Sequence, residues 1–544
     1  MKRRKFLTLD FENGSSKFKF SKHNYLFEKR SSAGLSEYKG DWTYTQAAHL
    51  LRRCIVGATE SEIQNSVLIG LSASVDKLLT NYTVNTDYIS DFIGQDAEVM
   101  PPGDRNSAEF QKWQQDQINK RERLMRWWLK IISSAPFSIQ EKMSLFLADH
   151  LTVGFDSVGP GEFMYEHNNL YRKYSLGNFK EFISDGSKTS AMLRYLNGDM
   201  NFVDTKNNKV NENFSRELLE LFTTGVYDLY GNQNYSQTDV YEGARALSGW
   251  VQSSSPKGQK FRSPKGQFIQ QRWDNKDKMY LGKKGNWKLD EILNIIFSER
   301  SVQVSEFVCN KLYKFFVYDL SSDKNIVQEL AKTFKENNWE LKPVLKQLLM
   351  SEHFYDNSNI GAVHKSPLDF YIGLVRSLKL QLIPDFTEDK SVIPIRELYA
   401  RLVTQGMDPF EPPNVAGWEG GRSWISVATL PARQKFVNDV MDEKLKGKNP
   451  PPGQQFPPIF YKFDAISFAK NFKDYNDIKK LSKNMALYLL NTSPSDKEYL
   501  FLYNSLLDGG VDYEWSLDDS NQKPNERIRK FLKAVATLSK YQLL

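Results

Sequence analysis

The sequence predicts an all-α protein, a large multi-helical globular fold with long irregular loops and at most a short β-hairpin. Three observations support this class. Apolar residues recur at helical spacing in most stretches after Trp42, sustained strand alternation is scarce, and the composition is that of a folded protein. Hydrophobic residues make up 40% of the 544 residues and charged residues 26%, so a sizeable core is expected.

Helical periodicity first appears in TYTQAAHLLRRCIVGATESEIQ, where Thr43 or Thr45 is a candidate cap and Gly57 breaks the pattern. Further helices are expected at 107–132, 138–151, 178–183, 189–196, 211–224, 236–247, 289–297, 302–316, 324–337, 342–350, 366–378 and 395–405. In the second of these, Ser138 and Glu141 have the spacing of a capping box. The hairpin is expected in GQKFRSPKGQFIQQRW, with a turn at Pro264-Lys265-Gly266.

Composition divides the chain into four parts. Residues 1–41 form a basic and aromatic, leader-like segment for which disorder is an open alternative, and residues 42–445 form the multi-helical main domain. Residues 446–460 are a proline-rich linker or loop, because proline cannot continue a helix. Residues 461–544 are expected to form a C-terminal helical segment that packs on the main domain. No stretch is long and apolar enough to predict a transmembrane segment.

The amino terminus, MKRRKFLTLDF, resembles a twin-arginine export signature in Arg3-Arg4 and Phe6-Leu7. An export signal also needs an apolar stretch of roughly 7–15 residues, and none follows here. The segment is therefore an uncleaved leader, a degenerate relic of one, or a basic start without meaning. Its mixture of basic and aromatic residues is also typical of interfacial segments, which makes weak peripheral membrane contact a further alternative.

Several function classes lose their usual support. The net charge of +7 is thinly spread and forms no dense basic run, so we expect no nucleic-acid binding. The sequence has no GxSxG elbow, Walker loop or GxGxxG fingerprint, and we expect no cofactor. The six histidines do not have metal-ligand spacing, so no metal site is predicted. Cys54 and Cys309 are interpreted as buried thiols, with a single disulfide left open.

The stretch NENFSRELLELFTTGV places acidic and basic residues along one helix face. On a helical wheel the apolar residues fall on one arc, and Glu212, Asn213, Arg216, Glu217 and Glu220 fall on the other. Arg216 lies four residues from both Glu212 and Glu220, so either glutamate can pair with it, for about 0.2–0.5 kcal/mol per pair. A solvated face explains this pattern. If another segment covers the face, a glutamate there becomes a candidate acid or base.

Two other stretches hold candidate site residues. His150 recurs with the apolar residues of SIQEKMSLFLADHLTVGF, where a lone histidine is more often a hydrogen-bonded core residue than a ligand. The stretch MDPFEPPNVAGWEGGRSWISVATLPAR specifies a rigid turn that presents Asn414, Trp418 and Arg422. Aromatic rings beside polar groups suit a planar ligand such as a sugar, and equally suit a loop that locks two helices together.

These stretches together resemble a large bacterial family catalogued as domain of unknown function 1800. The similar segments are AAHLLRRCIVGAT, YRKYSLGNFKEF, NENFSRELLELFTTGV, YSQTDVYEGARALSGW, FVCNKLYKFFV and PFEPPNVAGWEGGRSWI, in the family's order from about Ala47 to Arg433. The resemblance implies a multi-helical fold and supplies no established reaction. Members frequently begin with a twin-arginine-like leader, and their genes often neighbour those of a sulfatase- and phosphatase-like family. An envelope role and such a protein partner are therefore implied.

The chain also departs from the family pattern at two places. Where members usually have a tryptophan-containing run ending in His-Phe, this chain reads FLADHL, which keeps His150 and has Leu147 in place of the tryptophan. Where members usually read His-Asp, this chain has Trp273-Asp274. The loss of that histidine puts in doubt any mechanism that depends on it.

Three functions remain open at this point. The first is an enzyme acting on an envelope glycan or other envelope substrate, with His150, Arg216, Glu217 and Glu220 as candidate catalytic residues. Its candidate substrate-binding residues are Asn213, Trp250, Asp274, Asn414, Trp418 and Arg422. The second is a non-catalytic scaffold or accessory partner of a sulfatase- or phosphatase-like protein, and the third is peripheral membrane binding. The missing apolar signal core favours the cytoplasm, whereas the RRKFL start and the resemblance favour the periplasm or envelope.

Overall fold

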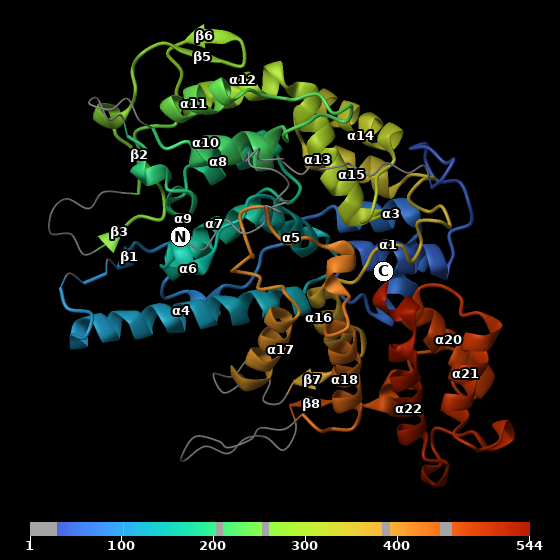
Figure 1. Cartoon of the computed structure of the whole chain (residues 1–544). Helices are drawn as coiled ribbons and strands as arrows, with labels where there is room; N and C mark the ends of the chain where they lie inside the picture. Colours follow the sequence, from blue (N-terminus) through green and yellow to red (C-terminus); the bar gives the residue numbers. More distant parts are fainter. Residues whose placement is uncertain are drawn as a thin grey trace, which may run out of the picture.

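The computed structural model confirms a mostly helical fold (Figure 1). The structure describes residues 30–98, 100–101, 103–202, 210–252, 261–382, 392–445 and 460–544. Most of the predicted leader-like segment and nearly all of the proline-rich linker lie outside these residues. The part of the leader-like segment that is described packs on the fold, since Glu37 forms a β-bridge with Ser351. None of the described helices is both long and apolar enough to cross a membrane.

The first half of the chain builds the centre of the molecule around α5. Almost every residue of α5 is buried, and its charged side chains have ionic partners: Lys142 pairs with Asp369 at 2.5 Å and Glu141 with Arg172 at 2.7 Å. The helices of this half are α1 (Tyr44–Cys54), α2 (Glu60–Ile69), α3 (Leu71–Leu78), α4 (Ala108–Ser133), α5 (Gln140–His150), α6 (Phe155–Val158), α7 (Gly161–Lys173), α8 (Phe179–Ser187) and α9 (Ser190–Tyr195).

The middle of the chain forms the group of helices drawn in green and yellow in Figure 1. Ser236 and Asp239 form a capping box that starts α11, and the long apolar face of α13 packs against α14. These elements are α10 (Asn213–Glu217), the π-helical turn η3 (Leu218–Thr223), α11 (Gln237–Ala246), α12 (Leu289–Glu299), α13 (Ser301–Phe316), α14 (Lys324–Glu336) and α15 (Leu341–Leu349).

The last third of the chain lies beside α1 and α4 and ends in the red helices of Figure 1. Ser366 and Asp369 form a capping box, and Pro367 occupies the first turn of α16, where its missing N–H is not needed. The helices here are α16 (Pro367–Ser377), α17 (Val392–Thr404), α18 (Thr429–Met441), α19 (Ala465–Ala469), α20 (Ile478–Leu490), α21 (Asp496–Leu507) and α22 (Pro524–Thr537), followed by the 3₁₀ turn η9 (Ser539–Gln542). In this third α22 packs against α18, and β7 pairs with β8.

The described strands are short and form four antiparallel pairs. They are β1 (Ala97–Glu98) with β3 (Phe261–Arg262), β2 (Trp250–Val251) with β4 (Gln267–Phe268), β5 (Lys278–Tyr280) with β6 (Lys283–Gly285), and β7 (Gln381–Leu382) with β8 (Tyr461–Lys462). The hairpin lies at β5 and β6, where Leu281 and Gly282 both have positive φ, as a two-residue hairpin turn requires.

The predicted hairpin around Pro264-Lys265-Gly266 is wrong, because its flanking strands β3 and β4 pair with other segments. The turn itself docks on the α8–α9 connection. Pro264 O accepts a hydrogen bond from Ser190 N at 2.8 Å, and Gly266 N donates one to Lys188 O at 2.7 Å. These contacts use the groups that would otherwise have closed the hairpin.

The predicted capping box of Ser138 and Glu141 is also not formed. The Glu141 carboxylate instead accepts hydrogen bonds from Arg172 and from Trp128 Nε1, and Ser138 Oγ donates to Thr80 O. A buried ion pair with its full set of hydrogen bonds outweighs a local cap. The prediction of buried thiols is confirmed, since Cys54 and Cys309 are both buried and free.

Candidate active site

The stretch that the sequence singled out folds as α10 followed by the π-helical turn η3. The wider turn is visible in the backbone, where Thr224 N donates to Leu219 O, five residues back, at 3.0 Å. Two threonine hydroxyls hold the turn, because Thr223 Oγ1 donates to Leu218 O and Thr224 Oγ1 to Leu219 O. Single π turns are rare in proteins and are frequently found at functional sites.

Of the two ion pairs predicted for Arg216, the structure forms the one with Glu212 and not the one with Glu220. Arg216 Nη2 lies 3.1 Å from Glu212 Oε2 and also donates to Gln237 Oε1, and both charged side chains are about one third exposed (35% and 34%). Glu220 does not complete the second pair. It lies beyond the point where the helix widens, and its Oε2 accepts a hydrogen bond from the Tyr235 hydroxyl at 3.3 Å. The sequence reasoning missed Tyr235, which precedes the cap of α11.

Glu217 is the residue of this stretch whose protonation is most altered. Its side chain is partly buried, and burial together with the charge of Glu220 raises its pKa to about 7, whereas Arg216 opposes the shift. Burial and Glu220 also raise the pKa of Tyr235. We call Glu212, Arg216, Glu217, Glu220 and Tyr235 the acidic stripe.

The acidic stripe has the chemistry of a proton donor and acceptor. A carboxyl group with a pKa of about 7 is protonated in about half of the molecules at neutral pH, so one residue can serve as general acid or general base. The stripe is also partly exposed, which lets a proton or a substrate group reach it. The sequence left open whether this polar helix face is solvated or covered by another segment. In the structure the face is partly buried.

His150, at the end of α5, contacts the π-helical turn η3 and is buried in the core. Its Nε2 lies 2.9 Å from the carbonyl oxygen of Phe222 in η3, and its Nδ1 lies 3.2 Å from Lys311 Nζ. A carbonyl only accepts, so the proton sits on Nε2 and Nδ1 accepts from the lysine. Burial and Lys311 lower the pKa of His150 well below its usual range. His150 is therefore a neutral histidine with both nitrogens engaged.

Two further ionisable groups surround His150, and the sequence analysis named neither. Burial raises the pKa of Asp149 to about 6, opposed by Lys311 and by a hydrogen bond from Trp418 N. Burial lowers the pKa of Lys311 to about 8, opposed by Asp149. Two features of the sequence could have indicated these groups: Lys311 interrupts the apolar pattern of α13, and Asp149 directly precedes His150. Within the described residues, no hydrogen bond or ion pair joins His150 to Glu217 or Glu220.

The tryptophan loop is clamped onto the end of α5. Trp418 N donates to Asp149 Oδ1 at 2.7 Å, and Thr152 Oγ1 donates to Val415 O at 2.9 Å. Trp418 is only 8% exposed, whereas Asn414 and Arg422 are exposed. The Asn414 side chain accepts a hydrogen bond from the backbone of Ala416 and so stabilises the turn. These contacts favour the interpretation of the loop as a lock between elements.

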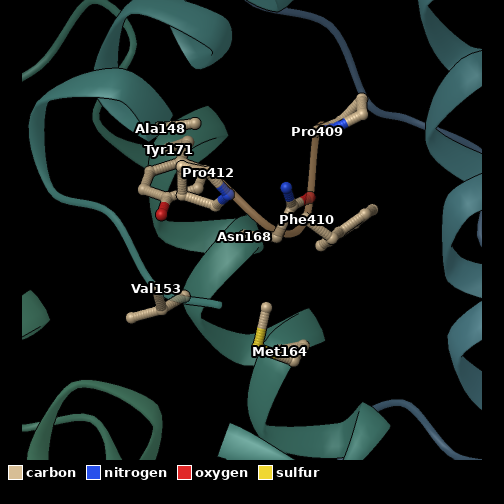
Figure 2. Close-up of a pocket in the computed structure, with 8 residues that line it drawn as sticks. All are labelled: Ala148, Val153, Met164, Asn168, Tyr171, Pro409, Phe410 and Pro412. Carbon is tan, nitrogen blue, oxygen red and sulfur yellow. The ribbon is translucent and has the colours of Figure 1, made fainter. Parts of the chain in front are cut away.

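Figure 2 shows how the start of this loop covers α7. Pro409, Phe410 and Pro412 lie over Asn168 and Met164, and the space between them measures ≈ 10 Å³. A single water molecule requires about 10–15 Å³ on this scale. The space has room for about one water molecule and is therefore too small for a substrate.

The remaining predicted site residues serve local structure. Asp274 forms a two-pronged pair with Arg245, at 2.8 and 3.2 Å, and its backbone carbonyl accepts from Lys278 Nζ. Trp250 packs on Phe268 with ring centroids 5.7 Å apart. Asn213 is exposed and donates from its amide to Leu196 O. In the described part of the chain, no group of three His, Cys, Asp or Glu side chains has the arrangement of a metal site.

The fold and the site together define a large helical protein with a partly buried, titratable acidic stripe where α10 passes into a π-helical turn. The chain belongs to the family DUF1800, described as a protein of unknown function, and the match covers residues 49–536. The match runs from within α1 to the last turn of α22. No curated protein and no solved structure matches the chain.

Proposed function

We propose that this protein is an enzyme of the bacterial envelope that uses Glu217 for proton transfer on a glycan or other envelope substrate. The observation that carries the proposal is the position of Glu217, partly buried beside Glu220, with a pKa raised to about 7. Perturbed carboxyl groups of this kind cluster at functional sites. The envelope location rests on the family resemblance and on the RRKFL start, and glycans are envelope substrates on which carboxyl groups typically act as acid and base.

In the proposed mechanism one carboxyl group, that of Glu217, serves as both general acid and general base. Glycoside hydrolysis with two carboxylates would need a second one across a cleft, about 5–10 Å away. Asp239, in the first turn of α11, and Asp274 are candidates for that role. Asp239 accepts hydrogen bonds from Ser236 and from Leu281 N, and Asp274 is held by Arg245, so neither is free to act on a substrate.

Arg216 and Tyr235 complete the proposed site. Arg216 remains about one third exposed although it pairs with Glu212, so part of its guanidinium is available to an anionic group of a substrate. The Tyr235 hydroxyl donates to Glu220 and so fixes the carboxylate whose charge, after burial, raises the pKa of Glu217. His150 has no direct role in this mechanism, because both of its ring nitrogens are engaged in the core.

The test is product release from isolated envelope glycans, followed by mass spectrometry, with wild type and Glu217→Gln. General acid/base catalysis contributes about 10²–10⁴-fold, so the variant should lose at least two orders of magnitude in rate. Glu212→Gln is the matched control, since it lies on the same stripe and should keep most of the activity. A folded Glu217→Gln protein that releases products at the wild-type rate would sink the proposal.

One surface favours a second function, that of an accessory partner of a sulfatase- or phosphatase-like protein. Helix α21 exposes Leu500 (57%) and Phe501 (46%), and Tyr513 nearby in sequence is 86% exposed. Adjacent exposed apolar side chains are typical of protein interaction sites. Co-elution of the native protein with such a partner, abolished by Phe501→Asp, would support this function. Elution of the native protein alone would refute it.

A further inference from the structure

A second polar cavity lies where the C-terminal helices meet the start of the chain. Its walls come from α1, α16, α20 and η9, and its volume is ≈ 40 Å³. One water needs about 10–15 Å³ on this scale, so the cavity has room for a group of several heavy atoms. Gly57 and Gly373 allow α16 to approach the end of α1, because a Cβ at position 57 would lie 2.5 Å from Gly373 O.

Two cationic side chains line this cavity without an acidic partner. Arg52 and Lys365 are each 8% exposed. Arg52 Nη1 donates to Leu489 O at 3.3 Å, while its Nε has no acceptor among the residues that the structure describes. The Lys365 ammonium lies 3.9 Å from the centre of the Tyr541 ring, and in the described ranges it has no hydrogen bond or ion pair.

The charges around the cavity do not balance. The carboxylate in its lining is Asp369, and this group is already paired with Lys142 at 2.5 Å and bonded to Ser366 Oγ at 2.8 Å. Glu60 also acts on Arg52 through its charge, but among the described residues it forms no ion pair with Arg52, and its carboxylate accepts a hydrogen bond from the Tyr44 hydroxyl. Arg433 adds a further buried cation beside the cavity, with Nη1 donating to Lys365 O at 3.1 Å. A buried charge is costly unless it is paired, so this excess of cations calls for an anion.

The open groove between α18 and α22 does not have this imbalance. It contains Lys435 and Lys444, and each has an aspartate partner, Asp439 and Asp442 respectively. The amino group of Lys365, by contrast, faces an aromatic ring and two guanidinium groups. Burial, followed by Arg52 and Arg433, lowers the pKa of Lys365 well below its usual range, although Asp369 opposes the shift, and a bound anion would oppose it further.

We propose that this cavity binds a small oxyanion of the phosphate or sulfate class, held by Arg52 and Lys365. The guanidinium offers N–H donors in a fixed plane, which suits the oxygen pairs of a tetrahedral anion, and the ammonium supplies a second, mobile donor. Tyr488 and Tyr541 form the aromatic walls. The site joins α1, α16 and the C-terminal helices, so a bound anion stabilises their junction. It is separate from the acidic stripe and does not depend on its function.

The test is thermal unfolding of the full chain titrated with inorganic phosphate or sulfate, against acetate and chloride at equal ionic strength. A ligand that binds the folded state raises Tm in a saturable manner. We expect such a rise with phosphate and sulfate, and its loss in Arg52→Gln and Lys365→Met. Lys435→Gln, which removes an exposed and paired lysine, should keep the full rise.

Two readouts separate loss of binding from loss of folding. Without oxyanion, Lys365→Met should unfold at or above the wild-type temperature, because replacing a poorly paired buried charge with an apolar side chain is often neutral or stabilising. Calorimetric titration with phosphate should give saturable heat for wild type and none for this variant. Equal Tm rises with phosphate in wild type and both variants, or rises with acetate and chloride as large as with phosphate, would overturn the proposal.

Discussion

At the scale of single residues, the chemistry of the acidic stripe depends on how its charges act on Glu217. Glu220 and Arg216 lie on the same short segment and shift the pKa of Glu217 in opposite directions, while burial sets the baseline. The sequence named all three residues. The sequence could not predict the pKa of Glu217, because the burial of this residue depends on which distant elements cover the acidic stripe. It also depends on the helix geometry, which the sequence does not reveal.

This balance predicts that two neighbouring substitutions move the pKa of Glu217 in opposite directions. Glu220→Gln removes a like charge and should lower it, whereas Arg216→Gln removes a compensating cation and should raise it. Both shifts are measurable by NMR titration of ¹³C-labelled glutamate carboxyls. Glu526→Gln, at an exposed position in α22, should leave the titration unchanged. Shifts of the same sign in both variants would contradict the electrostatic account.

The same group predicts a pH-dependent term in stability. The folded-state pKa of about 7 is above the ordinary 4.5, so the favourable contribution is complete below about pH 4.5 and is lost as pH rises through 7. The loss is at most about 3 kcal/mol, from 1.36 kcal/mol per pKa unit, and partial exposure reduces it. Glu217→Gln should therefore unfold at a higher denaturant concentration than wild type at pH 8.5, with a smaller difference at pH 5. An unchanged difference between the two pH values would argue against the raised pKa.

At the scale of elements, the local sequence pattern predicted the helices well but predicted poorly which strands pair with each other. The boundaries of α4, α13 and α16 lie within one or two residues of the expected ranges, because the apolar spacing of all three and the serine caps of α4 and α16 are local features of the sequence. The π turn was not predicted, because the apolar residues of this stretch have the spacing of an ordinary α-helix and do not reveal where the backbone widens. The hairpin at Pro264 failed for a similar reason, as its strands found long-range partners.

The docking of the tryptophan loop predicts a marked sensitivity at Gly417. Its φ of 86° is left-handed, and a Cβ there would lie 2.5 Å from the Asp149 carbonyl oxygen. Gly417→Ala should destabilise the protein by more than the about 1–3 kcal/mol expected from backbone strain alone. Gly420→Ala is the matched control, because it has a similar φ of 71° and open space around it. Chemical unfolding should therefore separate the two variants, and equal losses would show that the loop does not press on Asp149.

At the scale of the whole molecule, the C-terminal helices and the first helices meet at a polar junction. The hydroxyl of Tyr488 in α20 lies 2.8 Å from Ser377 O and 3.2 Å from Ala58 O. The sequence predicted a C-terminal helical segment and its approximate start, because proline-rich composition marks the boundary. The cations that face this junction were not predicted, since Arg52 and Lys365 come together only through the tertiary fold.

Loss of the Tyr488 hydroxyl should weaken this junction. Tyr488→Phe removes the single O–H that Ser377 O and Ala58 O share, and we expect a loss of about 1–2 kcal/mol in the free energy of unfolding. Guanidinium unfolding followed by circular dichroism measures it. Tyr513→Phe, at a position that is 86% exposed, should change stability by less than 0.5 kcal/mol, about the usual limit for surface substitutions. Indistinguishable unfolding midpoints for the two variants would count against the junction.

The most direct test of the acidic stripe is the pKa of Glu217 in the intact protein. ¹³C-labelled glutamate carboxyls are titrated by NMR, and the Glu217 signal is assigned by its disappearance in Glu217→Gln. The account predicts a midpoint of about 7 for this carboxyl. A midpoint at or below the ordinary value of 4.5 would contradict it and would leave the stripe as an ordinary solvated helix face.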